Sequence, residues 1–597
     1  MNKEISRRYS DKELFKRLFK YIKPVLPKFI LCLFLVVVIV LIELLPSYIT
    51  GEVVNILNGE PQLFKNTNLE TIVLIRYILL GLILVYLLEL IVNYIYSMTL
   101  QHLGQDLIYE IRKETFEHIM SLSIGQINRE HIGKLVTRVT NDTNALSELF
   151  TSVLVTLVRY ILTIVAIYVA LWINSPRLTL YVSIVLPIII LSTVLFRVYS
   201  RKAYRDVRNN LSIMNSYLSE NISGMKVIQI FNQENKKYNE FSEKNINLRR
   251  ANLSQVFIFS IFRPLIYFLS VIAIIITLYF GSIEVHNGNI LIGTLITYYS
   301  LLNNFFSPIE NLAEQFNQLQ SALASCEKIF TNLDTKVDIV DLEYPITNKE
   351  IKGKIEFKHV WFAYNEGVWI LKDVSFVVEA GESCAFVGAT GAGKTTILSL
   401  LSRNYEFQKG EILIDDIDIR KYSIKYLREN IGQMLQDVFL FSGTIRDNIT
   451  IHDLKYSDED IMEACKFVNC DSIINKYPDK LDHIVEERGA NYSQGERQLI
   501  SFARTVLSKP NIMILDEATA NIDTETEKLI QDSLSQMKSI GTMLVVAHRL
   551  STIQHSDKII VLNHGLVKEI GTHQELLAKK GMYYALYELQ YKGSKNE

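Results

Sequence analysis

The stretch "GATGAGKTT", Gly388 to Thr396, decides the fold of the C-terminal half of this chain. It matches the phosphate-binding pattern G-x-x-x-x-G-K-[ST]. The apolar run Cys384–Val387 before it reads as a strand, and "TTILSLLSR" after it reads as a helix. Glycines allow backbone amides to wrap phosphate groups in front of a helix N-terminus, which attracts negative charge. This order of strand, loop and helix predicts a nucleotide-binding α/β domain.

The motif also predicts individual roles. Lys394 should reach the β- and γ-phosphates, and the Thr395 hydroxyl should bind magnesium. The residues predicted to surround the nucleotide phosphates are Gly388, Ala389, Thr390, Gly391, Ala392, Gly393, Lys394, Thr395 and Thr396. A second motif, "NIMILDEAT", ends an apolar run at Asp516 and Glu517. We expect Asp516 to hold magnesium through water, and Glu517 to polarise the attacking water or take its proton. A solvated turn is the alternative for this acidic pair.

The composition indicates a membrane protein with several domains. The 597 residues exceed the usual size of one domain, and 49% of them are hydrophobic. A net charge of −2 predicts no bulk attraction to nucleic acid. The five cysteines are scattered, so neither a disulfide framework nor a zinc site is expected, and Cys465 and Cys470 should be ordinary core residues.

Long apolar stretches occur only before residue 320. Each has about the 20 residues that a helix needs to cross a membrane. The six predicted spans are 29–49, 72–96, 149–172, 178–196, 256–280 and 291–316. The last one, "LIGTLITYYSLLNNFFSPIENL", is more polar, so a surface helix is its alternative. An even number of spans agrees with the distribution of charges.

Positive charges predict the orientation of these spans, because cytoplasmic loops are rich in Lys and Arg. Residues 1–28 carry nine Lys and Arg residues, 97–148 carry five and 197–255 carry eleven. The intervening stretches 46–71, 173–177 and 281–290 carry one, one and none. The N-terminus, the two long loops and everything after residue 320 are therefore predicted to be cytoplasmic.

The two long loops show helical patterning and too little apolar content for cores of their own. We expect each to be a helical hairpin that continues two spans into the cytoplasm; a separate soluble insert is the alternative. The predicted fold is a multi-domain chain, with an all-α six-helix transmembrane domain over residues 1–325. A linker at 326–352 leads to an α/β P-loop ATPase domain over 353–597, where "KIEFKHVWFAY" and "ESCAFVG" read as strands.

The C-terminal half resembles the nucleotide-binding domain of an ABC transporter, and the whole chain resembles a bacterial ABC exporter half-transporter with the type IV exporter fold. The resemblance implies that Tyr364 stacks on adenine and that Gln436 contacts magnesium and senses the membrane domain. It also implies that Glu487 contacts the helical loops, that Asp523 lies in a loop crossing the dimer interface, and that His548 contacts the γ-phosphate. ATP and Mg²⁺ are the implied cofactors.

The resemblance also identifies the tips of the cytoplasmic loops. "REHIGKLVT", Arg129 to Thr137, and "YLSENISGM", Tyr217 to Met225, match the short coupling helices that dock on the ATPase domains. In this family the second one usually reaches the partner's domain.

The family signature L-S-G-G-Q is altered here to "YSQGE", Tyr492 to Glu496. In the family this segment closes on the ATP held by the other subunit, with a serine hydroxyl and backbone amides aimed at the γ-phosphate. Ser493 and Gly495 keep that core. Gln494 adds a side chain where backbone must approach phosphate. Glu496 adds a negative charge near the polyphosphate, and the alternative is that its carboxylate points away. The Tyr492 side chain is expected to serve packing only.

Two interpretations of this signature remain open. The changes are either tolerated variants or a partial loss of function. Partial loss resembles the subunit of heterodimeric bacterial multidrug exporters that carries the catalytic glutamate and pairs with a chain whose signature is intact. A second half-transporter is required as partner in either case, because one chain cannot form two sites.

The substrate is the least determined feature. Charged residues in or near the spans tend to face the bundle interior or water; they are Glu43, Glu89, Arg159, Arg263, Glu310 and Glu314. Four aromatic residues could face a bulky apolar ligand or simply pack: Tyr298, Tyr299, Phe305 and Phe306. The favoured function is ATP-driven export of amphipathic drugs or toxins across the bacterial cytoplasmic membrane. The alternatives are a homodimeric lipid or glycolipid flippase, an ATP-gated regulatory protein, and peptide or siderophore export.

Overall fold

The computed structural model describes residues 9–62, 70–516, 524–546 and 553–594. The chain forms two compact units. The first comprises residues 1–120 and 132–336, and the second comprises 121–131 and 337–597. The division at residue 336 falls inside the predicted linker, and a short segment of the first long loop, 121–131, belongs to the second unit.

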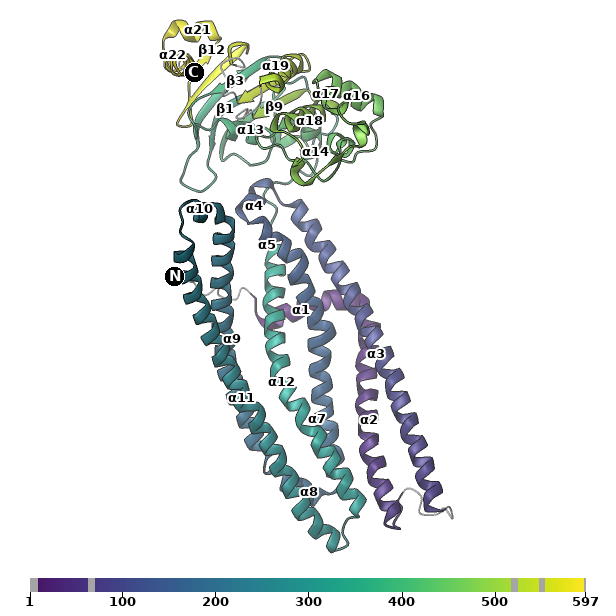
Figure 1. The fold of residues 1–597 in the computed structure, drawn as a ribbon. Coiled ribbons are helices and arrows are strands. Elements are labelled where there is room, and N and C mark those ends of the chain that lie inside the picture. Colours follow the sequence, from purple (N-terminus) through teal and green to yellow (C-terminus); the bar gives the residue numbers. More distant parts are fainter. Residues whose placement is uncertain (1–8, 63–69, 517–523, 547–552, 595–597) are drawn as a thin grey trace. The chain divides into compact units, whose positions relative to one another are not determined.

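The first unit is built of long helices (Figure 1). Its N-terminal helix α1 packs Leu14, Leu18 and Ile22 against the bundle. The helices of this unit are α1 (Asp11–Ile22), α2 (Leu26–Leu57), α3 (Thr71–Ser121), α5 (Ile132–Thr137), α6 (Thr143–Glu148), α7 (Leu154–Asn174), α8 (Pro176–Ser183), α9 (Leu186–Ser223), α10 (Met225–Ile230), α11 (Glu234–His286) and α12 (Ile292–Leu333). Short 3₁₀ and π turns join α1 to α2 and α5 to α7, so these stretches are nearly continuous.

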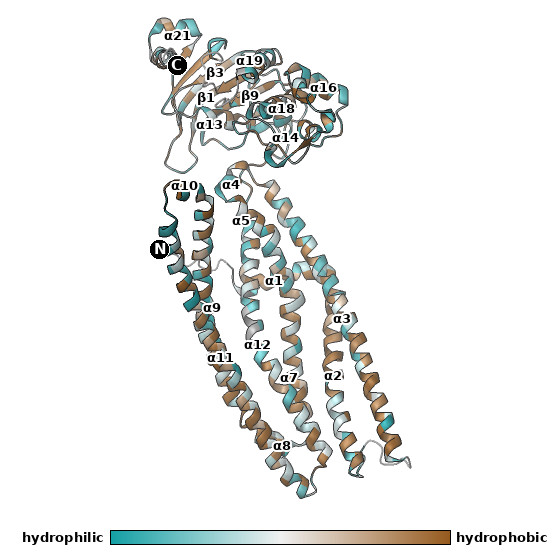
Figure 2. Ribbon diagram, in the orientation of Figure 1, coloured by the Kyte–Doolittle hydropathy of each residue, from teal (hydrophilic) through white to brown (hydrophobic). Residues whose placement is uncertain are grey.

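Five helical stretches among the described residues are long and apolar enough to cross a membrane: 12–57, 71–121, 132–174, 176–223 and 234–286. They contain the first five predicted spans. Figure 2 shows that α9 and α11 are hydrophobic toward α8 and more hydrophilic toward α10, which is the pattern predicted for spans that continue into a cytoplasmic hairpin. The sixth predicted span lies in α12, which is not one of these five stretches but packs against α2, α7 and α11. That span stays a prediction.

The aromatic residues of α12 mostly serve packing. Tyr298, Phe305 and Phe306 are buried in one apolar cluster with residues of α7, α9 and α11, and the Tyr298 hydroxyl donates to Thr179 Oγ1 at 3.2 Å. Of the four aromatic residues considered for ligand contact, only Tyr299 is exposed, at 40%. The interpretation that the other three face a ligand is therefore wrong for this structure, because their rings are buried against neighbouring helices of the bundle.

The tips of both long loops lie a few residues away from the predicted segments. In the first loop the short helix is α4 (Ile124–Arg129), and α5 begins three residues later. In the second loop α9 continues to Ser223, and the short helix is α10 (Met225–Ile230). The predicted segments instead fall across the α4–α5 junction and the last turns of α9. Ser123 caps α4 through a reciprocal hydrogen-bond pair with Gln126, and Gly224 ends α9, so the local breaks follow from the sequence.

The second unit is an α/β domain with two principal sheets. A four-stranded antiparallel sheet has the order β2-β1-β4-β5, and a six-stranded, mostly parallel sheet has the order β12-β11-β3-β10-β9-β6. The strands are β1 (Ile355–Phe362), β2 (Leu371–Val378), β3 (Ser383–Val387), β4 (Lys409–Ile414), β5 (Ile417–Asp418), β6 (Ile431–Met434), β9 (Ile512–Asp516), β10 (Thr542–Val546), β11 (Lys558–Asn563) and β12 (Leu566–Gly571). The predicted strands after residues 353, 381 and 511 are confirmed.

One face of the parallel sheet packs against helices that include α16 (Asp458–Phe467) and α18 (Gln494–Leu507), and the other packs against α13 (Lys394–Leu401) and the antiparallel sheet. The side chains of β3, β9 and β10 are buried throughout. Such strands read as continuous apolar runs because both faces of the sheet are covered. The helices and minor strands of this unit are α4, α13, α14 (Ile424–Asn430), β7 (Gly443–Thr444), α15 (Ile445–Thr450), α16, α17 (Asp471–Ile474), β8 (Ile484–Val485), α18, α19 (Thr524–Met537), α21 (His573–Lys579) and α22 (Met582–Ser594). Cys465 and Cys470 are buried and free, as expected.

Candidate nucleotide-binding site

The predicted catalytic segments all follow strands of one parallel sheet. In the sheet register, Phe386 of β3 pairs with Val546 of β10, and Val546 pairs with Asp516 of β9. The carboxyl ends of parallel strands lie at the same edge of a sheet, which is where ligands bind in open α/β folds. Glu517, Asp523 and His548 continue the chain beyond β9 and β10 but lie outside the described residues. Their predicted roles therefore remain predictions.

The phosphate loop needs glycine at two positions for reasons the structure shows. Gly393, which precedes α13, has φ +102°, and an added Cβ would come within 2.6 Å of Leu371 Cδ2. Gly388 has φ +153°, and its Cβ would meet the Leu562 carbonyl oxygen at 2.2 Å. The left-handed conformation and the close backbone approach both exclude larger residues. The loop is thereby fixed as an open turn leading into a helix N-terminus.

The side chain of Lys394 folds back onto the phosphate loop that precedes it. Its ammonium Nζ donates to the carbonyl oxygens of Gly388 at 2.7 Å and Ala389 at 3.2 Å. Burial lowers the pKa of Lys394 below its ordinary value, although the nearby Asp516 carboxylate opposes that shift. A lysine held in this way can exchange carbonyl oxygens for phosphate oxygens without a large rearrangement.

The remaining loop residues and the strand end fit a magnesium–nucleotide complex. Thr395 is exposed at the second position of α13, whereas Thr396 is buried behind it. Asp516 is 8% exposed at the carboxyl end of β9. Hydroxyl and carboxylate oxygens are the donors that Mg²⁺ prefers, usually together with waters and phosphate. Thr395 and Asp516 would hold the ion, and Gln436, exposed just after β6, is the third predicted ligand.

Tyr364 lies beside the phosphate loop. Its hydroxyl is 3.1 Å from Thr396 Oγ1, and 37% of its surface is exposed. Its ring meets the edge of Tyr405, with centroids 5.0 Å apart. An aromatic ring held at this position can offer one face to a base, as the adenine-stacking prediction requires.

Tyr405 connects this ring to the tip of the first long loop. A Cβ on Gly125 of α4 would lie 2.7 Å from Tyr405 Cε1, so the backbone of α4 rests directly on the phenol ring. Asn128 Nδ2 donates to the Tyr405 hydroxyl at 3.2 Å. A cavity of about 120 Å³ adjoins Tyr364, Tyr405 and α4. Contacts therefore run without interruption from α4 through Tyr405 and Tyr364 to the phosphate loop.

The altered signature starts a regular helix. Ser493 is the N-cap of α18, and its Oγ accepts from the Glu496 amide at 3.2 Å. The Glu496 carboxylate accepts in return from the Ser493 amide at 3.0 Å and from Lys476 Nζ at 2.8 Å. Gln494 is exposed at the first position of the helix, and Gly495 is buried. Tyr492 packs in the core of this unit, as expected.

These contacts show what the charge added by Glu496 meets within its own chain. Burial raises the pKa of its carboxyl, but the hydrogen bonds from Lys476 and Ser493 outweigh burial and hold that pKa below the ordinary value. The carboxylate is therefore ionised, and its charge is paired with that of Lys476. Of the two substitutions, Gln494 is therefore the one that alters the exposed N-terminus of α18.

No motif of the sequence points to three further residues of this site. Gly125, Tyr405 and Lys476 match no motif, and each acts through a neighbour distant in the sequence. The glycine in "SIGQIN" was the one available signal, since glycine inside a helix costs stability and usually has a packing reason. Glu487 is exposed in a short 3₁₀ turn before the signature, which leaves its predicted contact with the helical loops a prediction.

Comparison with known proteins agrees with this architecture. Residues 29–309 match the family model of the ABC transporter transmembrane region, and residues 371–520 match the ABC transporter model. A protein of Syntrophus aciditrophicus named "ATP-dependent lipid A-core flippase" is 32% identical over 584 residues, covering 98% of this chain and 95% of its own. The Bacillus subtilis "Probable multidrug resistance ABC transporter ATP-binding/permease protein YheH" is 38% identical over 506 residues, covering 83% and 74%.

A solved structure, "Structure of a bacterial Atm1-family ABC exporter with ATP bound", superposes with a TM-score of 0.79. It covers 95% of this chain and 98% of its own at 23% identity, so it shows the fold. The chain is a membrane ATPase that couples ATP hydrolysis to transport. It belongs to the ABC transporter family and has the exporter half-transporter architecture, with the transmembrane and ATP-binding domains on one polypeptide.

Proposed function

We propose that this chain is one half of a heterodimeric exporter of amphipathic small molecules in the bacterial cytoplasmic membrane. Its N-terminus and ATPase domain lie in the cytoplasm, which is the side predicted by the Lys and Arg residues of the long loops. The relative named for multidrug resistance supports this substrate class.

The heterodimer is proposed because of the altered signature at the start of α18. ABC exporters work as dimers, and each signature helix serves the ATP held by the other subunit. Gln494 places an exposed side chain at the first helical position, where backbone amides and the helix dipole must meet a phosphate. The phosphate loop of the same chain is regular. Paired with a chain whose signature is intact, it would form two unequal sites, whereas two copies of this chain would form two identical ones.

The residues divide the catalytic work as follows. Bound Mg²⁺ would neutralise phosphate charge, with Thr395 and Asp516 among the residues that hold it. Lys394 and the loop amides bind the β- and γ-phosphates, and Tyr364 stacks on adenine. Glu517 orients the attacking water and accepts its proton, while His548 and Gln436 contact the γ-phosphate and the ion. Closure of the ATPase dimer over bound nucleotide draws the helical arms together, because ATP has a higher affinity for the closed state.

The test compares two serine variants in the assembled transporter. Affinity purification of this chain should bring down a second, different half-transporter. Alanine in place of the partner's signature serine should then abolish turnover at Glu517, whereas Ser493→Ala should reduce ATPase activity only mildly. Equal and nearly complete losses would instead support a symmetric dimer.

A homodimeric lipid flippase is the second candidate. The relative named as a lipid A-core flippase covers nearly the whole chain and favours it. Purification of a dimer that contains this chain alone, with ATPase activity, would support that candidate over the heterodimer.

A further inference from the structure

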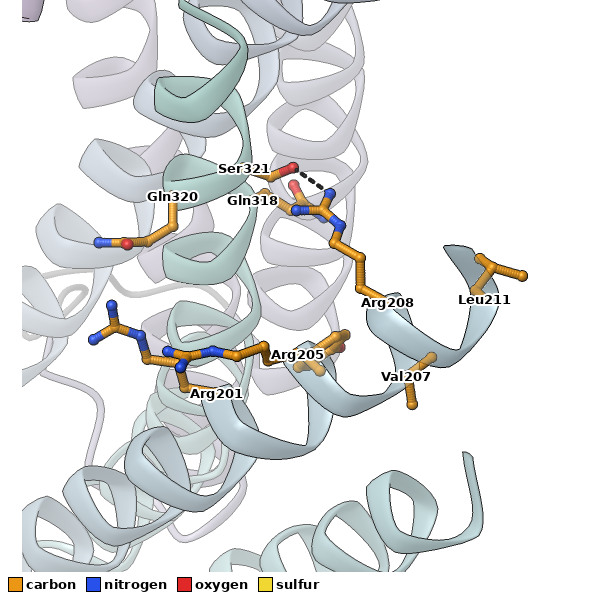
Figure 3. Close-up of a pocket in the computed structure, with 9 residues that line it drawn as sticks. Arg201, Arg205, Val207, Arg208, Leu211, Gln318, Gln320 and Ser321 are labelled. Atoms are coloured by element: carbon orange, nitrogen blue, oxygen red, sulfur yellow. Dashed lines mark hydrogen bonds between the residues drawn. The ribbon is translucent and has the colours of Figure 1, made fainter. Parts of the chain in front are cut away.

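Three arginines lie along one side of α9, facing α12. Arg201, Arg205 and Arg208 are spaced by four and three residues, which places them on one helix face. Together with Gln318, Gln320 and Ser321 of α12 they line a cavity of about 610 Å³. Figure 3 shows the guanidinium groups of Arg201 and Arg205 extending toward the side of α12, and that of Arg208 reaching Ser321.

The cavity is strongly cationic. Arg208 Nη2 donates to Ser321 Oγ at 3.3 Å, and no ion pair involves any of these three arginines within the described part of the chain. Its other described lining residues include no acid, and Asp206, the nearest acid along α9, is not one of them. Like charges one helical turn apart destabilise a helix, so this arrangement favours a bound anion.

The same cavity also has an apolar wall. Val207 and Leu211 line it. Tyr204, a further lining residue, meets the edge of Phe259 of α11 with centroids 6.1 Å apart, and Phe259 packs against Phe196. A ligand with a negatively charged head and an apolar tail would satisfy both parts of this surface.

The position along α9 matches the edge of a membrane. The predicted span ends at residue 196, so Arg201 lies about 7.5 Å and Arg208 about 18 Å further along the helix at 1.5 Å per residue. The headgroup layer on each side of the hydrocarbon is about 5–8 Å thick. The cavity thus begins at headgroup depth, where basic pockets between helices bind anionic headgroups.

We propose that the cavity between α9 and α12 binds the phosphate or carboxylate head of an anionic amphiphile at the cytoplasmic edge of the membrane. The depth argument rests on the proposed orientation of the exporter. Two sources share this chemistry, namely a lipid of the bilayer and an exported amphiphile.

Binding is measured first, without ATP. The full transporter, purified in dodecyl maltoside, is titrated with dodecyl phosphate and with zwitterionic dodecylphosphocholine, and thermophoresis follows binding. Dodecyl phosphate should bind more tightly, and Arg201→Gln/Arg205→Gln should weaken it at least about tenfold, because two charge-assisted contacts are lost. Arg205→Lys should retain most of the affinity.

The matched control is Lys202→Gln, which removes an exposed positive charge from the same turn of α9 but not from the cavity lining. It should leave the affinity unchanged. Equal binding of both amphiphiles, or equal losses in Lys202→Gln and the arginine variants, would overturn the proposal and leave only diffuse attraction to a basic surface.

Reconstitution distinguishes the two sources. If a bilayer lipid is the ligand, ATPase activity should respond to phosphatidylglycerol in phosphatidylcholine vesicles, and the double arginine variant should lose that response. If an exported amphiphile is the ligand, dodecyl phosphate should stimulate ATPase activity in vesicles of phosphatidylcholine alone. Intact binding without any ATP-dependent movement of an amphiphile would count against the proposed export function, whereas movement of cationic drugs without anion binding would count against this site.

Discussion

At the residue scale, Glu496 shows how a substitution in a motif can be neutral for local structure. Glutamate fits the same capping box as the glutamine of the family signature, because either side chain can accept from the N-cap amide. The added charge is compensated by Lys476, which is 20 positions earlier in the chain. The cost of this change to the protein is therefore small.

Glu496 should contribute to stability because its side chain completes the N-terminal capping box of α18. Glu496→Ala should lower the free energy of unfolding by about 1 kcal/mol, since it removes the reciprocal cap. Glu496→Gln should retain the cap and lose only the ion pair with Lys476. Thermal unfolding of the purified transporter checks both, and equal losses would contradict a capping role.

The same residue predicts a pH dependence. The pKa of folded Glu496 lies below its ordinary value of 4.5. Its contribution to stability is thus complete above pH 4.5 and is lost as the pH falls through the lower, folded pKa. Unfolding midpoints measured from pH 6 downward should fall less steeply in Glu496→Gln than in the parent protein. An unchanged slope would show that the carboxylate is not held by Lys476.

Glu517 is the residue predicted to act as the general base in ATP hydrolysis. Glu517→Gln should leave ATP binding intact and reduce turnover to below about a tenth of the parent rate, because it removes a general base. Glu525→Gln, an exposed acid of α19, is the control and should keep normal turnover. Nucleotide-binding and phosphate-release assays separate the two steps. A rate above that level would argue against Glu517 as the principal base.

At the element scale, α4 is held by close packing as well as by polar contacts, which include the ion pair between Arg129 and Asp338. Its backbone lies on the Tyr405 ring at Gly125, and Tyr405 in turn contacts Tyr364 beside the phosphate loop. A short helix linked to the phosphate loop through two aromatic side chains is suited to report the occupancy of the nucleotide site. This contact is possible because Gly125 has no side chain.

Gly125→Ala should therefore disturb the docking of α4. The new methyl group would force the Tyr405 ring aside, at a cost of about 1–3 kcal/mol. We expect substrate-stimulated ATPase activity to fall several-fold. Gly133→Ala is the matched control, since no atom lies within 4 Å of a Cβ added to Gly133 in α5. If both alanine variants behave alike, the contact with Tyr405 does not matter for coupling.

At the scale of the whole molecule, the native cysteines allow a direct test of orientation. All five are buried, so an added exposed cysteine can be labelled selectively. Glu60→Cys should react with a membrane-impermeant maleimide from outside intact cells, and Asn235→Cys only after the cells are opened. Both positions are exposed in the structure. The reverse labelling pattern would overturn the predicted topology.

The sequence by itself determined the two-part architecture, the phosphate loop and the strand end at Asp516. Backbone conformation at glycine, helical hydropathy and the order of strand, loop and helix are local properties, which a short window of residues already fixes. The tertiary structure alone decided which residues meet. It placed Gly125 on Tyr405, paired Glu496 with Lys476, buried three aromatic residues of α12 and gathered three arginines of α9 opposite α12. These outcomes depend on packing between segments far apart in the chain, and no local pattern encodes such contacts.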